Sequence, residues 1–117
     1  MKRGPKPQDP RLVFLSGNIT RAKSRRDGKK ITLTPQEAFE IGQNQKWRCA
    51  ITKKKLEFTR GGTYFGGKWC NPLSCSIDRI DNSKGYTKDN VQLVTWACNR
   101  ARGNLSVEDF KFYLGLK

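Results

Sequence analysis

The order of apolar and polar residues predicts two helices in the N-terminal part of the chain. The first is expected over residues 11–27, where apolar side chains recur at helical spacing at Leu12, Val13, Leu15 and Ile19. The second begins at Thr34, because Thr34 and Glu37 can form a capping box and Pro35 fits a first turn that needs no amide donor. We expect this second helix to end near Gln45.

The middle of the chain is typical of strands, turns and loops. Residues 47–58 are expected to form a short hairpin region, and glycines on both sides of residues 63–65 indicate flexible loops there. Residues 72–80 fit a loop that enters a strand, and residues 82–85 fit a turn.

The last third of the chain predicts two more helices. Apolar residues on one helical face predict a helix over residues 90–102, and Ser106, with Asp109 as its capping partner, begins another. Helices and strands in this mixture favour the α+β class. The 117 residues are enough for one domain with one modest core.

The charge of the chain points to nucleic acid. Lys and Arg number 24 against 10 Asp and Glu, a net charge of +14, and residues 1–30 alone hold ten basic and two acidic residues. Such a surface neutralises phosphates. A membrane partner is not expected, because no apolar run could span a bilayer and no basic face is paired with a wide apolar one. No apolar leader is visible, so we expect a cytoplasmic rather than a secreted protein.

Histidine is absent, which excludes mechanisms that need an imidazole. Four cysteines, Cys49, Cys70, Cys75 and Cys98, allow two disulfides, one zinc site or ordinary buried thiols. A reducing compartment disfavours disulfides. Only one pair of cysteines is close in sequence, whereas zinc sites usually have two close pairs, so zinc and buried thiols both stay open.

Residues 76–102 carry the candidate chemistry. Asp78 on a strand and Asn99 on a later helix can be brought together by the turn between them. A carboxylate and an amide oxygen at one place suit a hard cation such as Mg²⁺. Basic residues surround the pair, as phosphodiester chemistry requires, at Arg79, Lys84, Lys88, Arg100 and Arg102.

This segment resembles the HNH endonucleases, which form the ββα-metal or His-Me finger superfamily. The resemblance rests on Asp78-Arg79-Ile80, Gly85-Tyr86, Asn90-Val91-Gln92-Leu93 and Cys98-Asn99-Arg100-Ala101-Arg102, with Cys49-Ala50-Ile51-Thr52 upstream. It covers about residues 47–110 and implies an α+β fold with a small ββα-metal core and flanking helices. We expect residues 1–33 to be a basic arm and helix that contact DNA, and residues 34–117 to be the nuclease domain.

The resemblance implies a Mg²⁺- or Mn²⁺-dependent endonuclease that hydrolyses phosphodiester bonds in double-stranded DNA. Phage, homing and restriction nucleases are similar, which implies the cytoplasm of a bacterial or phage-infected cell. Asp78 and Asn99 would hold the metal, and Asn90 would brace the loop. The residues expected to bind DNA phosphates are Arg21, Arg25, Arg26, Lys84, Arg100 and Arg102.

The chain departs from the family pattern at its histidine and its zinc cysteines. Arg79 replaces the histidine base and cannot take a proton, so we expect it to clamp the scissile phosphate. The proton acceptor is open among Tyr86, Asp81, a metal-bound hydroxide and a substrate phosphate. The family has two C-x-x-C pairs. One cysteine of each pair remains in this chain, Cys49 and Cys98, and threonines occupy the two partner positions. Structural zinc would need Cys70 and Cys75 in a rearranged site.

Each site residue also has an ordinary alternative. Asp78 could form a surface ion pair with Arg79 or Arg100, Asn90 could cap a helix, and Asn99 could be a solvated helix residue. Two other functions stay open: an HNH-like DNA-binding module without catalysis, and a basic RNA-binding protein. The sequence gives neither the oligomeric state nor the target site.

Overall fold

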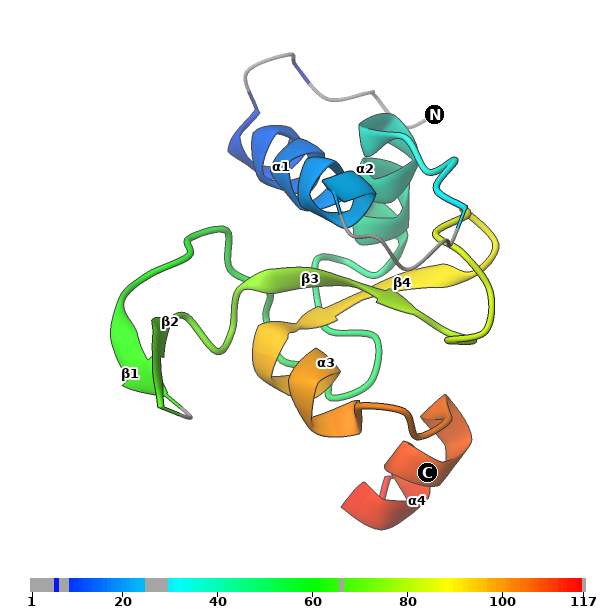
Figure 1. Ribbon diagram of the computed structural model, residues 1–117. Coiled ribbons are helices and arrows are strands. Elements are labelled where there is room, and N and C mark those ends of the chain that lie inside the picture. The colour runs from blue at the N-terminus through cyan, green and yellow to red at the C-terminus, as the bar shows by residue number, and fades with distance from the viewer. Residues whose placement is uncertain (1–5, 7–8, 25–29, 66, 117) are drawn as a thin grey trace.

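The computed structural model describes residues 6, 9–24, 30–65 and 67–116. Within them the chain forms four helices and four short strands that pair into two antiparallel sheets (Figure 1). The elements are α1 (Pro10–Ser24), α2 (Pro35–Asn44), β1 (Thr63–Phe65), β2 (Lys68–Cys70), β3 (Cys75–Arg79), β4 (Val91–Thr95), α3 (Trp96–Arg102) and α4 (Val107–Leu114). This is an α+β fold, as the sequence predicts.

Local capping signals fix where two of the helices begin. Thr34 Oγ1 accepts a hydrogen bond from the Glu37 amide at 3.1 Å, and the Thr34 amide donates to Glu37 Oε1 at 3.0 Å, so the predicted capping box of α2 is confirmed. Ser106 Oγ likewise accepts from the Asp109 amide at 3.0 Å and starts α4. The start of α1 also agrees with the prediction, whereas its predicted last residues, 25–27, lie outside the described part of the chain.

The predicted helix over residues 90–102 is wrong in its first half. Val91–Thr95 is strand β4, and α3 begins only at Trp96, with Thr95 as its N-cap. β4 is buried at four of its five positions, on both of its faces. A short apolar run of this kind has no period-2 alternation, so spacing alone does not separate it from a helical face.

The segment around residues 63–65, expected to be a loop, forms a two-stranded ribbon. β1 pairs antiparallel with β2, with Tyr64 opposite Trp69. Threonine and aromatic residues favour strands, and this preference outweighs the flanking glycines. The predicted hairpin region at residues 47–58 is confirmed by an antiparallel bridge between Arg48 and Lys55.

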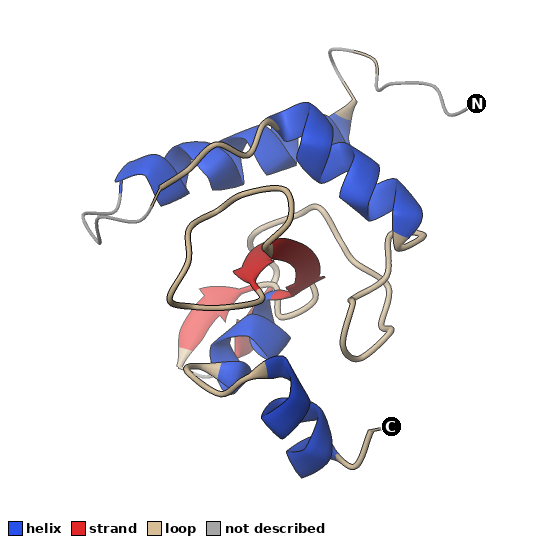
Figure 2. Ribbon diagram, turned by 90° about the vertical axis from the view of Figure 1, so that its right-hand side faces the viewer, coloured by secondary structure: helices blue, strands red, loops and turns tan. Residues whose placement is uncertain are grey.

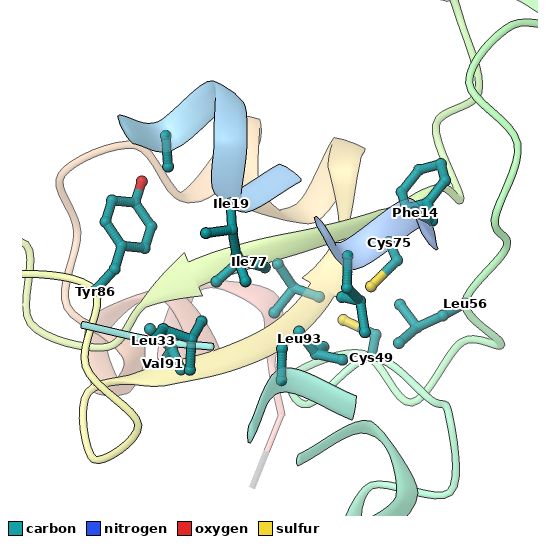
Figure 3. Close-up of a cluster of buried hydrophobic side chains, with 14 of the residues drawn as sticks. Phe14, Ile19, Leu33, Cys49, Leu56, Cys75, Ile77, Tyr86, Val91 and Leu93 are labelled. Carbon is teal, nitrogen blue, oxygen red and sulfur yellow. The ribbon is translucent and has the colours of Figure 1, made fainter. Parts of the chain in front are cut away.

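The β3–β4 sheet lies between two layers of helices (Figures 1 and 2). Helices α1 and α2 pack together against one face, and α3 packs against the other. One hydrophobic core joins all these elements (Figure 3), and its members from α1 are Leu12, Phe14, Leu15, Ile19 and Ala22. Helix α1 is therefore built into the same core as residues 34–117. No helix among the described residues is long and apolar enough to cross a membrane.

Close packing at Gly42 gives a test of this core. A Cβ at Gly42 would lie 2.1 Å from a ring carbon of Trp47, whereas a Cβ at Gly17 would first meet the mobile end of Arg60, at 3.1 Å. We expect Gly42→Ala to lower the free energy of unfolding by about 1–3 kcal/mol through overpacking. Gly17→Ala should be neutral or stabilising by up to about 1 kcal/mol, because alanine is the better helix former.

Urea denaturation followed by circular dichroism measures both variants. Equal stability of Gly42→Ala and the unchanged protein would contradict the packing of Trp47 against α2.

Candidate active site

The candidate site is built on the unit formed by β3, β4 and α3. β3 and β4 pair antiparallel, with Asp78 opposite Gln92. β4 continues directly into α3, which packs back on β3. The chain thereby brings Asp78 of β3 and Asn99 of α3 to the walls of one cavity, as the sequence predicts.

Asn90 braces the loop between the two strands. Its Nδ2 donates to the carbonyl oxygens of Asp81 and Gly85, at 3.0 and 2.9 Å, and its Oδ1 accepts from the Asp81 amide at 2.9 Å. The alternative of a helix cap is wrong, because Thr95 caps α3. The bracing geometry is the one that the family resemblance implies for Asn90.

A buried ion pair holds Asp78 in place. Arg102 Nη2 lies 2.7 Å from Asp78 Oδ1, and each side chain is 2% exposed. Gln92 Nε2 donates to the other carboxylate oxygen at 3.0 Å. The suggested surface ion pair of Asp78 with Arg79 or Arg100 is therefore wrong.

The prediction that Arg102 binds a DNA phosphate is also wrong, because this side chain is buried. Its guanidinium donates to the carbonyl oxygens of Leu105 and Arg79 and to Asn82 Oδ1, so it ties α3 to the loop after β3 and to the start of α4. Arg102 Nε has no hydrogen-bond partner within the described residues. Arg102 holds the Asp78 carboxylate and is itself buried.

The cavity holds most of the predicted catalytic side chains. It has a volume of about 360 Å³, and its lining includes Asp78, Arg79, Tyr86, Asn99 and Arg100. The Arg79 guanidinium lies over the Tyr86 ring, 5.0 Å from its centroid, and Arg79 Nη1 donates to the carbonyl of Lys84 at 3.4 Å. Asn99 Nδ2 donates to Ser76 Oγ at 2.8 Å, which fixes the orientation of its amide.

The structure separates the two candidate side chains for proton transfer. Tyr86 lines the cavity beside Arg79. Asp81 lies in a different hollow, and its Oδ1 accepts from the Ser83 amide at 2.9 Å and from Ser83 Oγ at 2.6 Å. Asp81 is thus part of the turn, and Tyr86 is the one of the two that faces the site.

A second cavity, of about 190 Å³, continues the first toward α1. The two cavities share Ile77, Tyr86 and Asn99 as lining residues and therefore adjoin, and the pair of them is here called the β3 groove. Arg21, predicted to bind phosphate, lines it together with Arg60. The predicted Arg25 and Arg26 lie outside the described residues.

Sequence reasoning missed Arg60. Its guanidinium stacks over the ring of Phe14, 4.3 Å from the centroid. Burial and the charge of Arg21 lower the pKa of Arg60. No local signal identifies this residue, because it joins the groove only through the packing of α1 beside β3.

Asp78 and Asn99 offer oxygen atoms that fit a hard divalent cation. Ionised carboxylate oxygens have about four lone-pair sites, so the bonds from Arg102 and Gln92 leave acceptor capacity on Asp78. Magnesium usually takes one or two carboxylates, several waters and substrate phosphates, so two protein ligands are sufficient.

The four-cysteine zinc site, one of the alternatives left open by the sequence, is not formed. Cys49, Cys75 and Cys98 are buried in the core, whereas Cys70 lies on β2 with its sulfur near the carbonyl of Phe65. Within the described residues, no group of three or more Cys, His, Asp or Glu side chains could hold a metal. Figure 3 shows the sulfur atoms of Cys49 and Cys75 facing each other inside the core.

Hydrogen bonds connect the elements that zinc would have joined. Cys98 donates to Cys49, which lowers the pKa of Cys49, and burial raises the pKa of Cys75 to about 12. The Thr52 amide donates to Cys49 Sγ at 3.4 Å, and Thr95 Oγ1 accepts from the Cys98 amide at 3.2 Å. Three of the four cysteines are thus buried thiols, and Cys70 is half-buried.

A strand pair, a loop braced by asparagine and a helix with the site between them define an HNH-type nuclease fold. The fold is similar to the solved structure of the rare-cutting HNH restriction endonuclease PacI, with a TM-score of 0.64. The match covers 97% of this chain and 90% of the PacI chain. The two sequences are 16% identical, so the likeness concerns the fold. The PacI structure is described as showing a mechanism of DNA perturbation. No family model and no curated protein matches the chain.

The two possible roles of Arg102 predict different results. We expect Arg102→Ala to lower the free energy of unfolding by about 3–5 kcal/mol, because it leaves the buried Asp78 carboxylate without a counter-charge. Arg100→Ala, in the same helix but exposed, should change it by less than about 1 kcal/mol.

Urea titrations of both variants measure this difference. A stable Arg102→Ala protein whose DNA binding has a salt slope lower by about one phosphate contact would instead support a phosphate contact at this position.

Proposed function

We propose that this protein is a Mg²⁺- or Mn²⁺-dependent endonuclease that hydrolyses phosphodiester bonds in double-stranded DNA. The observation that carries the proposal is the meeting of Asp78 and Asn99 at one cavity whose other charged lining residues are Arg79 and Arg100. Oxygen ligands for a cation beside guanidinium groups for a phosphate are what phosphodiester hydrolysis requires. The HNH-type fold supports the same chemistry.

The charges of the site indicate that DNA and the cation bind together. Arg102 already balances the charge of Asp78, and Arg79 and Arg100 make the cavity positive. A divalent cation is therefore poorly attracted until a DNA phosphate adds its negative charge. When bound to Asp78 and Asn99, the metal would stabilise charge on the leaving 3′ oxygen.

The chain's own groups supply the remaining functions. Arg79, oriented by the Tyr86 ring and the Lys84 carbonyl, clamps the scissile phosphate through its planar fork. Asn90 keeps the loop in shape, and Tyr86 is the side chain placed to exchange a proton. Arg21 and Arg60 extend the positive surface along the β3 groove for the DNA backbone. We place this activity in the cytoplasm of a bacterial or phage-infected cell, as for a phage, homing or restriction nuclease.

Removal of the cation ligands should abolish cleavage. We expect Asn99→Ala to slow conversion of supercoiled plasmid to relaxed or linear forms by about a hundredfold or more. Asp78→Asn should act likewise and keep the volume of the side chain. Asn44→Ala, at the exposed end of α2, is the matched control and should cleave normally.

The assay uses Mg²⁺ and Mn²⁺ over a broad pH range, with EDTA as the blank. Wild-type protein that retards DNA in gels but never cleaves it would show a binding module instead of an enzyme. Preference for RNA over DNA at matched salt would point to an RNA-binding protein.

The Arg79 clamp has its own test. We expect Arg79→Ala to lower kcat by about 10²–10³-fold, because the charge that develops on the phosphate loses its fixed partner. The urea midpoint should stay unchanged, since the Arg79 side chain is partly exposed. Arg48→Ala, an exposed arginine outside the β3 groove, serves as the control, and Arg79→Lys should recover part of the rate.

Single-turnover cleavage of a labelled duplex measures kcat for each variant. Normal turnover by Arg79→Ala would overturn the clamp.

A further inference from the structure

The β1–β2 ribbon presents two exposed aromatic rings on one face. Tyr64 and Trp69 are directly opposite each other, as are Phe65 and Lys68. Because side chains alternate along a strand, the first pair shares one face of the ribbon and the second pair shares the other. Tyr64 is 72% exposed and Trp69 is 69% exposed, far more than aromatic side chains in a packed core.

The opposite face attaches the ribbon to the active-site unit. Phe65 packs edge-on against Trp96 of α3, with ring centroids 6.5 Å apart, and Arg100 lies over the same Trp96 at 5.2 Å. Trp96 also lines the β3 groove. In Figure 1 the ribbon extends to the side of the β3–β4 sheet and is joined to it by the segment that enters β3. The ribbon therefore lies beside Trp96, where α3 begins, and the exposed rings are on the face of the ribbon that points away from Trp96.

Trp69 is held in a defined position although it is exposed. A Cβ on Gly61 would lie 2.9 Å from Trp69 Nε1, so the indole rests directly on the backbone before β1. A ring held in this way loses little conformational freedom on binding. This favours a role in recognition over incidental exposure.

The charges around the ribbon identify the class of partner. No Asp or Glu occurs between Glu57 and Asp78, and the two cations of this stretch are Arg60, which lines the β3 groove, and Lys68, which is on the other face of the ribbon from the two rings. Flat aromatic faces combined with cations fit a polyanion that has π faces of its own, which is nucleic acid. Two further exposed rings, Phe112 and Tyr113, lie instead on a helix with Glu108 and Asp109 in its first turn.

We propose that the Tyr64–Trp69 face binds unpaired nucleobases of DNA by stacking, beside the phosphate that lies in the β3 groove. The inference deepens the proposed function, because DNA is the ligand of both. Stacking tolerates any base, so this surface strengthens binding where bases leave the duplex and does not itself read a sequence.

Binding of a fluorescein-labelled single-stranded oligonucleotide, measured by anisotropy in EDTA, tests the proposal without cleavage. We expect Trp69→Ala and Tyr64→Ala each to weaken binding about tenfold, with the same dependence on salt as the wild type. Tyr113→Ala, an equally exposed ring on α4, should bind normally. Lys68→Gln should instead lower the salt slope by about one phosphate contact.

Trp69→Phe distinguishes stacking from loss of structure, because it keeps a ring and should retain most of the affinity. Bound DNA should quench tryptophan fluorescence in the wild type and much less in this variant. Normal binding by both alanine variants would overturn the proposal. So would a change in their sedimentation without a change in DNA binding, which would indicate an interface between protein chains.

The outcomes separate this inference from the proposed function. If DNA quenches the fluorescence of Trp69 but the protein never cleaves plasmid, the stacking face is supported and the proposed endonuclease activity is contradicted. If the protein cleaves plasmid while Trp69→Ala and Tyr64→Ala bind DNA normally, the endonuclease activity is supported and the stacking face is contradicted.

Discussion

The ion pair between Asp78 and Arg102 is the interaction on which the rest of the site depends. Removing two charges from water is unfavourable, and a buried pair is tolerated only where further hydrogen bonds complete it. Here Gln92 donates a further hydrogen bond to the Asp78 carboxylate, and the guanidinium of Arg102 donates to the carbonyl oxygens of Leu105 and Arg79. Those bonds join both strands, the loop after α3 and the end of α3, so the pair that orients the Asp78 carboxylate also fixes the ββα unit around it.

This pair divides the arginines of the site into two kinds. Arg102 is buried inside the protein, where its charge neutralises that of Asp78. Arg79 and Arg100 line the cavity, and Arg21 and Arg60 continue the positive surface along the β3 groove. The net charge of +14 thus includes individual cations that occupy distinct places relative to one carboxylate.

Features that depend on neighbouring residues could be predicted from the sequence. The capping box at Thr34 and the cap at Ser106 lie within single turns, and the spaced residues Asp78, Asn90 and Asn99 follow in the order of the HNH pattern. The fold and the shared cavity agree with that order. The roles of these residues in catalysis stay predictions for the cleavage assays.

What the sequence misassigned depends on tertiary contacts. Position 102 suits a phosphate contact or a buried ion pair equally well, and only the packing of α3 on β3 decides between them. Residues 91–95 became a strand because β3 offers them a partner, and their burial on both faces hides the alternation of a strand. Cys70 and Cys75 are close in the chain, yet Cys75 is buried in the core and Cys70 is not, a difference that their spacing does not indicate.

Helix α3 connects the two surfaces that we assign to DNA. Trp96 at its start supports the ribbon through Phe65, and Arg102 at its end holds Asp78. At 1.5 Å per residue, these seven residues span roughly 10 Å. Stacked nucleotides advance about 3.4 Å along a strand, so α3 alone is as long as about three stacked nucleotides, and the ribbon adds to the separation between the Tyr64–Trp69 face and Asp78. A short rigid helix of this kind would let an unstacked base determine which phosphate reaches the cavity.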